Sequence, residues 1–231
     1  MPLLAPQFPR TYLDVNRHPG DIDLALLDGP WPHDHVPSGK AQLGKALLWR
    51  TLHDGRALYD RRLSVAEVVH RIEQHHRLYH AQLKALLDAA HARFGVVFHI
   101  NCHSMSAFGG AMGEGRAGLP RADIVLGDRG GTTCAPQFTV FVRGLVLVQG
   151  YSVKVNDPFK GAELVRAYAD PAAGRHSLQL EVNKRPNMEN GQIASNGAQI
   201  FAKSAGFAPL QAHLMHLIDA IDTRFNPVDC S

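Results

Sequence analysis

The chain has 231 residues, of which 45% are hydrophobic and 19% are charged, a composition typical of a globular domain with a sizeable core. Its formal net charge of +3 is too small and too scattered to indicate nucleic-acid binding, and no apolar run approaches the roughly 20 residues of a membrane span. The first residues lack the features of a signal peptide and the three cysteines show neither zinc-binding nor disulfide spacing, so we expect a cytoplasmic protein with a single domain over residues 1–231.

The N-terminal region is rich in proline and contains one short alternating stretch. Residues 12–17, Tyr-Leu-Asp-Val-Asn-Arg, predict a short strand that places Asp14 and Asn16 on one face. Arg17 follows at the end of this strand, where an arginine by itself is a surface residue. Residues 18–62 show no sustained period and predict a long loop with a short helix near residues 42–52. Loops of this length are often functional.

The next stretch predicts a long helix. Ser64 and Glu67 have the spacing of a capping box, and apolar residues then recur at helical spacing as far as Leu87. Two of the histidines on this helix, His76 and His80, lie four residues apart on one face. A two-histidine zinc motif would need a glutamate after the first histidine, and arginine stands there instead. We therefore expect these histidines to be solvated or partly buried and not to bind metal.

A buried strand follows over residues 94–105, and its polar residues share one face. His99, Asn101 and His103 point to the same side of a regular strand. His99 and His103 would be about 13 Å apart, too far to bind one zinc ion. His103 is at the carboxyl end of the strand, where open α/β sheets bind ligands, although a histidine in such a place can also be a core residue.

The remainder of the chain alternates strands and helices. Strands are expected at 123–128, 151–155 and 177–183, and helices at 135–149, 162–169 and 207–224. This order predicts an α/β fold with a mainly parallel sheet that is covered on both faces. On the strand 177–183, the side chains of Gln179, Glu181 and Asn183 share one face.

Three of these residues supply the parts of a metal-dependent hydrolase. His103 is a metal ligand by type, Glu181 is a carboxylate that could take a proton from water, and Arg17 is a cation for an anionic substrate. Glu181 could equally lie on the solvent face of an edge strand. A serine hydrolase is less favoured because Ser104 lacks the surrounding glycines of a nucleophile elbow, and strand alternation points Cys102 away from His103.

Six motifs in order resemble the N-formylglutamate amidohydrolase family. They cover roughly residues 10–190, which is most of the chain. They are Asp14-Val-Asn-Arg17, Tyr79-His80-Ala-x-Leu83, Asn101-Cys-His-Ser-Met105, Asp123-Ile-Val-Leu-Gly-Asp128 with Cys134-Ala-Pro136, Phe159-Lys-Gly161 with Arg166, and His176-Ser-Leu-Gln-Leu-Glu-Val-Asn-Lys184 ending at Met188.

The resemblance implies a zinc-dependent amide hydrolase related in fold to the zinc carboxypeptidases, with a three-layer α/β/α architecture and a mixed, largely parallel sheet. It implies that His103 is a zinc ligand and that Glu181 is the general base and acid. Asn16 and Arg17 would bind the carboxylate of the substrate, with help from Arg10 and Arg166. The family reaction converts N-formyl-L-glutamate to formate and L-glutamate, so the expected partner is a small N-acyl amino acid.

One part of the family pattern has no match in this sequence. The family carries its other zinc ligands in a Pro-His-Ser/Ala-Gly motif and an acidic motif, and nothing before Tyr12 matches them. We therefore expect a chain that begins after the first strand of the fold, or else a degenerate member that binds carboxylates without catalysis. A zinc amidase for another N-acyl amino acid or a small peptide is the third reading, and the oligomeric state stays open.

Overall fold

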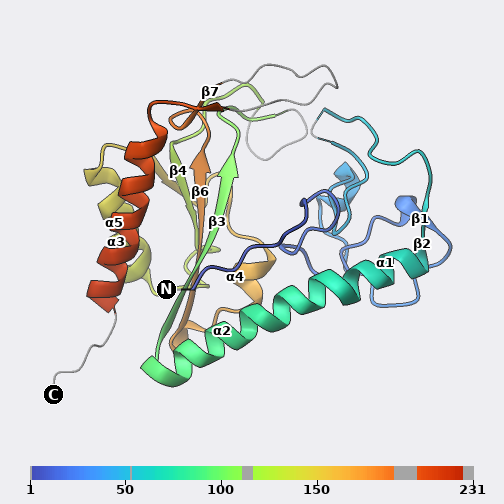
Figure 1. Ribbon diagram of the computed structural model, residues 1–231, viewed down its shortest axis with the longest axis horizontal. Coiled ribbons are helices and arrows are strands. Elements are labelled where there is room, and N and C mark those ends of the chain that lie inside the picture. The colour runs from blue at the N-terminus through green and yellow to red at the C-terminus, as the bar shows by residue number, and fades with distance from the viewer. Residues whose placement is uncertain (1, 53, 111–116, 190–201, 226–231) are drawn as a thin grey trace. The chain divides into compact units, whose positions relative to one another are not determined.

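The computed structural model describes residues 2–52, 54–110, 117–189 and 202–225 (Figure 1). The chain divides into two compact units. The first unit contains Met1–Arg93 and Ala162–Tyr168, and the second contains Phe94–Gly161 and Ala169–Ser231. Each unit is described by itself below. That the two fold as the one domain expected from the sequence stays a prediction.

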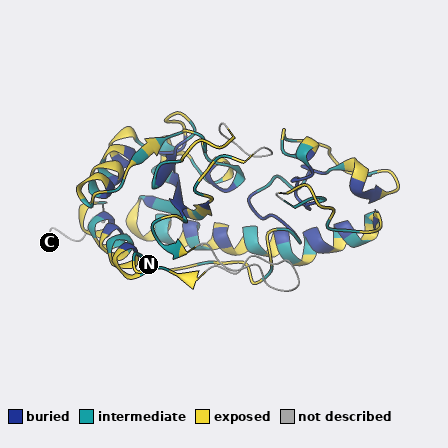
Figure 2. Cartoon of the chain, turned by 90° about the horizontal axis from the view of Figure 1, so that it is seen from above, coloured by how far each residue is buried: buried dark blue, intermediate teal, exposed yellow. Residues whose placement is uncertain are grey.

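The first unit is built around one long helical rod, which runs from Val65 to Phe94. Its elements are η1 (Leu24–Leu26), β1 (Leu27–Asp28), η2 (Ala41–Leu43), β2 (Leu63–Ser64), α1 (Val65–Arg71), the π-helical turn η3 (Ile72–Arg77), α2 (Leu78–Phe94) and α4 (Glu163–Ala167). The side chain of Ser64 accepts a hydrogen bond from the amide of Glu67, so the predicted cap and helix are confirmed. Figure 2 shows buried and exposed residues alternating along this rod, as expected for an amphipathic helix.

Two predictions for the first unit are wrong. Residues 12–17 do not form a strand, because Asp14 Oδ1 accepts from the amide of Asn16 and its carbonyl accepts from the amide of Arg17, which closes a turn. The helix expected near residues 42–52 is also absent. Only a 3₁₀ turn forms, at Ala41–Leu43, and it stops at Gly44, whose φ of +66° is left-handed.

The second unit contains a four-stranded sheet in the order β3-β6-β4-β5. Its elements are β3 (Val97–Met105), β4 (Ile124–Gly127), α3 (Pro136–Val148), β5 (Val153–Val155), η4 (Pro171–Ala173), β6 (Arg175–Asn183), β7 (Met188–Glu189), β8 (Ala202–Lys203) and α5 (Phe207–Phe225). β3 runs parallel to β6, and β4 parallel to β5, whereas β4 and β6 are antiparallel. The predicted mixed α/β fold with a mostly parallel sheet is therefore confirmed. Short β7 and β8 pair with each other.

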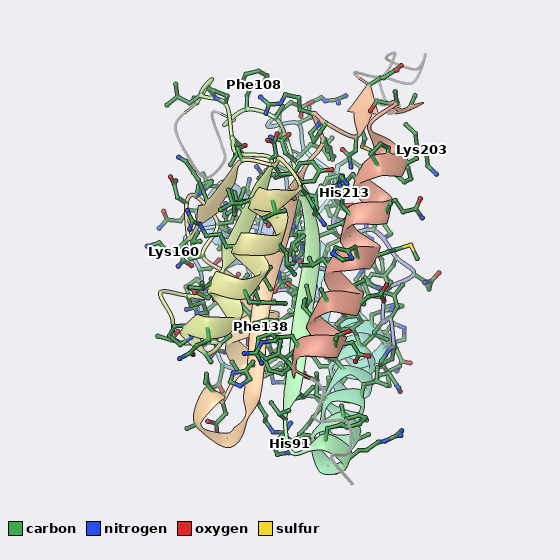
Figure 3. The ribbon with its side chains drawn as sticks, turned by 90° about the vertical axis from the view of Figure 1, so that its left-hand side faces the viewer. His91, Phe108, Phe138, Lys160, Lys203 and His213 are labelled. Carbon is green, nitrogen blue, oxygen red and sulfur yellow. The ribbon has the colours of Figure 1, made fainter. Side chains whose placement is uncertain are left out.

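One face of the sheet forms the apolar core of the second unit. Buried side chains of β4 and β6, including Leu126, Leu178 and Leu180, pack with buried side chains of α3 and α5. Phe138 of α3, labelled in Figure 3, is fully buried, and its ring centroid lies 4.6 Å from that of Phe98 on β3. Apolar residues thus occupy every second position of these strands on this face.

The opposite face of the same sheet is mainly polar. Alternation places His99, Asn101 and His103 of β3 there, and Ser177, Gln179, Glu181 and Asn183 of β6. The four β6 residues are all buried, with exposed fractions between 0% and 7%. A buried polar sheet face is costly unless its groups are hydrogen-bonded, so it directs attention to a functional site.

None of the helices in the described ranges combines the length and the apolar character that a membrane crossing requires.

Candidate functional site

The polar sheet face brings His103 and Glu181 to paired positions near the carboxyl ends of two strands. In the parallel register His103 is the partner of Glu181, two residue pairs before Met105 and Asn183 at the ends of the strands. Paired residues on neighbouring strands have their backbones about 4.8 Å apart and their side chains on one face. β6 lies between β3 and β4, so the alternative of an edge strand for Glu181 is wrong, and its exposed fraction is only 7%.

Two amide side chains in the preceding polar pair of the ladder hold these groups. Asn101 pairs with Gln179 in the register, directly before His103 and Glu181 on this face. The Oδ1 atom of Asn101 lies 2.7 Å from Nε2 of His103, and Nε2 of Gln179 donates to Oε1 of Glu181 at 2.9 Å. Because an amide oxygen only accepts, Nε2 of His103 carries a proton and donates it to Oδ1 of Asn101. The ring of His103 and the carboxylate of Glu181 are therefore each oriented by an amide side chain two residues earlier on the same strand.

His99 belongs to this face but has the features of a core histidine. Its Nδ1 is hydrogen-bonded to the hydroxyl of Ser177 at 2.8 Å. Burial lowers the pKa of His99 to about 4, so the ring is neutral near neutral pH. His99 stands four residues before His103 on a regular strand, the separation that argues against a shared metal ion.

The donor groups of the described residues do not complete a zinc site. A catalytic zinc takes three protein ligands and a water molecule. Among the residues that the structure describes, no three histidine, cysteine, aspartate or glutamate side chains gather closely enough to hold a metal ion. His103 is thus a single candidate ligand, and the zinc implied by the sequence resemblance does not fit these residues alone.

The first unit contains a cluster of four charged side chains, which we call the Arg17 cluster: Arg10, Asp14, Arg17 and Asp21. Arg10 Nε donates to Asp14 Oδ2 at 2.8 Å, and Arg17 Nε lies 3.5 Å from the same oxygen. Arg17 Nε also lies 3.9 Å from Asp21 Oδ2, an oxygen that accepts from the hydroxyl of Ser38 at 2.7 Å. The two carboxylates are buried, with exposed fractions of 1% and 2%, and they orient the guanidinium by charge.

The Nε atom of Arg17 is held by charge, close to two carboxylates. This Nε is buried and makes no hydrogen bond within the described residues, and the side chain of Arg17 is only 13% exposed. A guanidinium has five N–H donors in a planar fork that suits a carboxylate. The geometry therefore leaves Arg17 suited to an additional anionic group, whereas a surface arginine would extend into solvent.

Two other residues predicted to bind substrate have structural partners. The side-chain oxygen of buried Asn16 accepts a hydrogen bond from the amide of Leu164 at 2.8 Å, which ties α4 to the N-terminal segment. Arg166, whose side chain is 51% exposed, forms a two-pronged ion pair with Glu163 at 2.9 and 2.7 Å. That pair raises the pKa of Arg166. Helper roles for Arg10 and Arg166 in substrate binding stay predictions.

Comparison with known proteins decides the family. The sequence profile described as N-formylglutamate amidohydrolase matches residues 1–188. The chain belongs to the N-formylglutamate amidohydrolase family. The family assignment made from six short motifs is therefore confirmed.

Individual members of the family resemble much of this chain. An N-formylglutamate deformylase from Pseudomonas putida is 30% identical over 190 residues, which cover 81% of this chain and 64% of the relative. One from Pseudomonas aeruginosa is 30% identical over 184 residues, covering 78% and 61%. The chain thus spans less than two thirds of the length of these curated relatives. The crystal structure of an N-formylglutamate amidohydrolase from Ralstonia eutropha JMP134 matches with a TM-score of 0.82 and 39% identity, covering 94% of this chain and 74% of that chain.

Within this family member, the structure brings the predicted residues together in two groups. His103 and Glu181 meet in the register of one sheet in the second unit, and Arg10 and Arg17 meet at one carboxylate in the first unit. Asn16 stands beside Arg17 in the sequence but directs its side-chain oxygen to α4.

Sequence reasoning missed the role of two histidines on the helical rod. His76 is only 3% exposed, and both His76 and His80 bond to the backbone of the segment that carries Arg17. Their four-residue spacing is the signal in the sequence, and it is shared with a two-histidine metal motif. A pair of polar residues on the buried face of an amphipathic helix also predicts hydrogen bonds to a neighbouring segment.

Proposed function

We propose that this chain is a hydrolase of N-formyl acidic amino acids that converts N-formyl-L-glutamate and water to formate and L-glutamate. Water attacks the formyl carbon, Glu181 takes the proton of that water, and the proton passes to the amide nitrogen as the carbon–nitrogen bond breaks. The proposal includes the finer fold assignment, a three-layer α/β/α architecture of the zinc carboxypeptidase type, and a cytoplasmic location.

The observation that carries the proposal is the His103–Glu181 pair on a buried polar sheet face in a member of this family. A general base must be held at a fixed place beside its substrate, and the amide of Gln179 restrains the carboxylate of Glu181. Relatives with 30% identity are named N-formylglutamate deformylases, which supports the same chemistry for this chain.

Arg17 is proposed to bind the carboxylate of the substrate. Its buried guanidinium lies next to two aspartates whose oxygens already accept hydrogen bonds from Arg10 and Ser38. The formal charges of Arg10, Arg17, Asp14 and Asp21 cancel, so recognition would depend on the direction of the N–H donors more than on net charge. Asn16 is proposed to bind the same carboxylate, while its side-chain oxygen accepts a hydrogen bond from the amide of Leu164.

The metal part of the proposal is limited to one ligand. His103, oriented by Asn101, would be one ligand of zinc, and bound zinc would supply Lewis acidity to a water molecule. The described residues do not gather the other donors, so no step is derived through the metal.

The incomplete donor set also favours a second function. A chain that keeps the fold and the Arg17 cluster without a full metal site would bind carboxylates and not catalyse. A zinc amidase for another N-acyl amino acid or a small peptide is distinguished from the main proposal by its substrate alone.

The proposal is tested by the release of formate from N-formyl-L-glutamate, compared with N-formyl-L-glutamine, N-acetyl-L-glutamate and a dipeptide, with zinc counted per chain. We expect slow hydrolysis with a preference for the N-formyl acidic substrate, and well under one zinc per chain because one histidine binds zinc weakly. Binding of N-formyl-L-glutamate without turnover would favour the carboxylate-binding function. Faster hydrolysis of another compound would favour an amidase for another N-acyl amino acid or a small peptide. If the chain neither hydrolysed nor bound any N-acyl amino acid, the proposal would be contradicted.

A further inference from the structure

Two histidines of the helical rod hold the backbone on either side of Asn16. His76 Nε2 lies 2.9 Å from the carbonyl oxygen of Arg17, and His80 Nε2 lies 2.8 Å from the carbonyl oxygen of Val15. A carbonyl oxygen only accepts, so both Nε2 atoms carry a proton and donate it. The backbone before and after Asn16 is thus fixed from one helix face.

The two imidazoles are packed so closely that they act as neutral donors. Their ring centroids are 4.0 Å apart and their planes differ by 20°. The pKa of His76 is lowered to about 4, mainly by burial and secondly by the charge repulsion of the neighbouring His80. Burial also lowers the pKa of His80. The charged or titratable groups that face them are Glu163 of α4, His18, Tyr168 and Tyr79. Near neutral pH the pair therefore donates as neutral rings of one tautomer.

Tyr168, which follows α4, contacts the other ring nitrogen of His80. Its hydroxyl lies 2.7 Å from His80 Nδ1 and 3.1 Å from the carbonyl oxygen of His80. Burial raises the pKa of Tyr168 to about 12, so the hydroxyl keeps its proton. The hydroxyl has a single proton, for which the carbonyl oxygen and Nδ1 of His80 are both within hydrogen-bond distance. The chain of polar contacts runs from Tyr168 through His80 to Val15.

The rod is distorted where the first of these histidines stands. Ile72–Arg77 forms a π-helical turn between two α-helical segments, and Ile72 and His76 are its buried residues. π turns are rare, their hydrogen bonding is less favourable than that of an α-helix, and they occur frequently at functional sites. The distortion is a second observation, independent of the hydrogen bonds, that marks this stretch as more than a packing helix.

We propose that His76 and His80 are positioning residues for substrate recognition, because they fix the backbone from which Arg17 extends. The inference rests on the proposed binding of a substrate carboxylate by Arg17. With its carbonyl and that of Val15 held, Arg17 keeps its guanidinium 3.5 and 3.9 Å from the carboxylates of Asp14 and Asp21. A shift of about 1 Å in a binding group can cost a large part of its effect.

The test is the affinity for N-formyl-L-glutamate, measured by calorimetry near neutral pH on the whole chain, which does not require turnover. His76→Leu and His80→Leu each remove one donor at similar volume and should weaken binding about 10-fold. His76→Gln and His80→Gln place an N–H near the position of Nε2 and should restore most of the affinity. His70→Leu, on the exposed side of α1, is the matched control and should bind as the unaltered chain does.

A reference variant separates failure of the inference from failure of the proposed function. If Arg17→Leu binds as well as the unaltered chain, carboxylate recognition by Arg17 is wrong, whatever the histidines do. If Arg17→Leu binds weakly while both folded leucine variants bind normally, the positioning role is overturned. Should the leucine variants fail to fold, ¹⁵N spectra of the unaltered chain decide: neutral rings protonated on Nε2 support the inference, and charged rings or protonation on Nδ1 overturn it.

Discussion

The His103–Glu181 pair and the Arg17 cluster are held in place by different means. His103 and Glu181 stand on regular strands, and Asn101 and Gln179, which hydrogen-bond to them, are two residues away on the same strands. Arg17 stands in a turn whose groups bond to residues far along the chain. Its carbonyl bonds to His76, and the side chain of its neighbour Asn16 bonds to Leu164.

The difference separates two ways of orienting a reactive group. A backbone ladder fixes the sheet pair, so a single side-chain substitution there should change chemistry and leave geometry intact. The loop cluster depends on individual hydrogen bonds from other segments, so substitutions there should change binding through geometry as well as charge.

The largest effect is expected for Glu181→Gln. Glutamine has the same shape and can still accept the hydrogen bond from Gln179, but it cannot take a proton from water. We expect kcat for N-formyl-L-glutamate to fall about 10²–10⁴-fold, the usual contribution of a general base. Initial rates of formate release measure it, with Glu189→Gln on exposed β7 as the matched control. A variant with unchanged kcat would remove Glu181 from the mechanism.

Arg17→Ala should produce the next largest effect, on binding. Loss of a hydrogen bond to a charged group costs about 1.5–3 kcal/mol, which corresponds to about 10- to 150-fold weaker binding of N-formyl-L-glutamate. Arg17→Lys should restore little, because an ammonium lacks the planar fork of a guanidinium. Calorimetric dissociation constants for N-formyl-L-glutamate and its uncharged diamide measure both points. Equal losses for the two ligands would argue against carboxylate recognition.

The smallest effect is expected in the pH dependence of stability. The folded pKa of His76, about 4, is below its unfolded value of 6.5, so between these values the unfolded chain binds a proton that the folded chain does not. Lowering the pH through this window should reduce the free energy of unfolding, by up to about 1.4 kcal/mol per pH unit from this group. His99, with a pKa of about 4, adds a contribution of the same sign.

His76→Gln isolates the contribution of His76, since it removes that titration and leaves the one of His99. Denaturant unfolding at several pH values between 6.5 and 4 should give a shallower slope for this variant, and His70→Gln should leave the slope unchanged. An identical slope for His76→Gln and the unaltered chain would mean that His76 is charged or solvated in the folded state.

The sheet side of this contrast could be predicted from sequence to a useful extent. Alternation of side chains predicted that Asn101 and His103 lie on one face of their strand. It predicted the same for Gln179 and Glu181 on a later strand. The pairing of His103 with Glu181, and the antiparallel neighbour β4, could not be predicted. Register depends on contacts between strands 78 residues apart in this chain, and no local pattern specifies it.

The loop side could be predicted only through the family motifs. Residues 12–17 alternate as a strand does, but the short side chain of Asp14 closes a turn on its own backbone. The bonds that hold this turn come from His76, His80 and Leu164, which are 59, 65 and 148 residues away from their partners. Such contacts are properties of the fold and leave no periodic trace in the sequence.

The most direct test measures binding and turnover of N-formyl-L-glutamate on the same two proteins, Glu181→Gln and Arg17→Ala. If the sheet pair performs the chemistry and the loop cluster recognises the substrate, Glu181→Gln should bind within about threefold of the unaltered chain while its kcat falls at least about 100-fold. Arg17→Ala should bind at least about 10-fold more weakly. Loss of affinity in Glu181→Gln, together with normal affinity in Arg17→Ala, would contradict this division of roles.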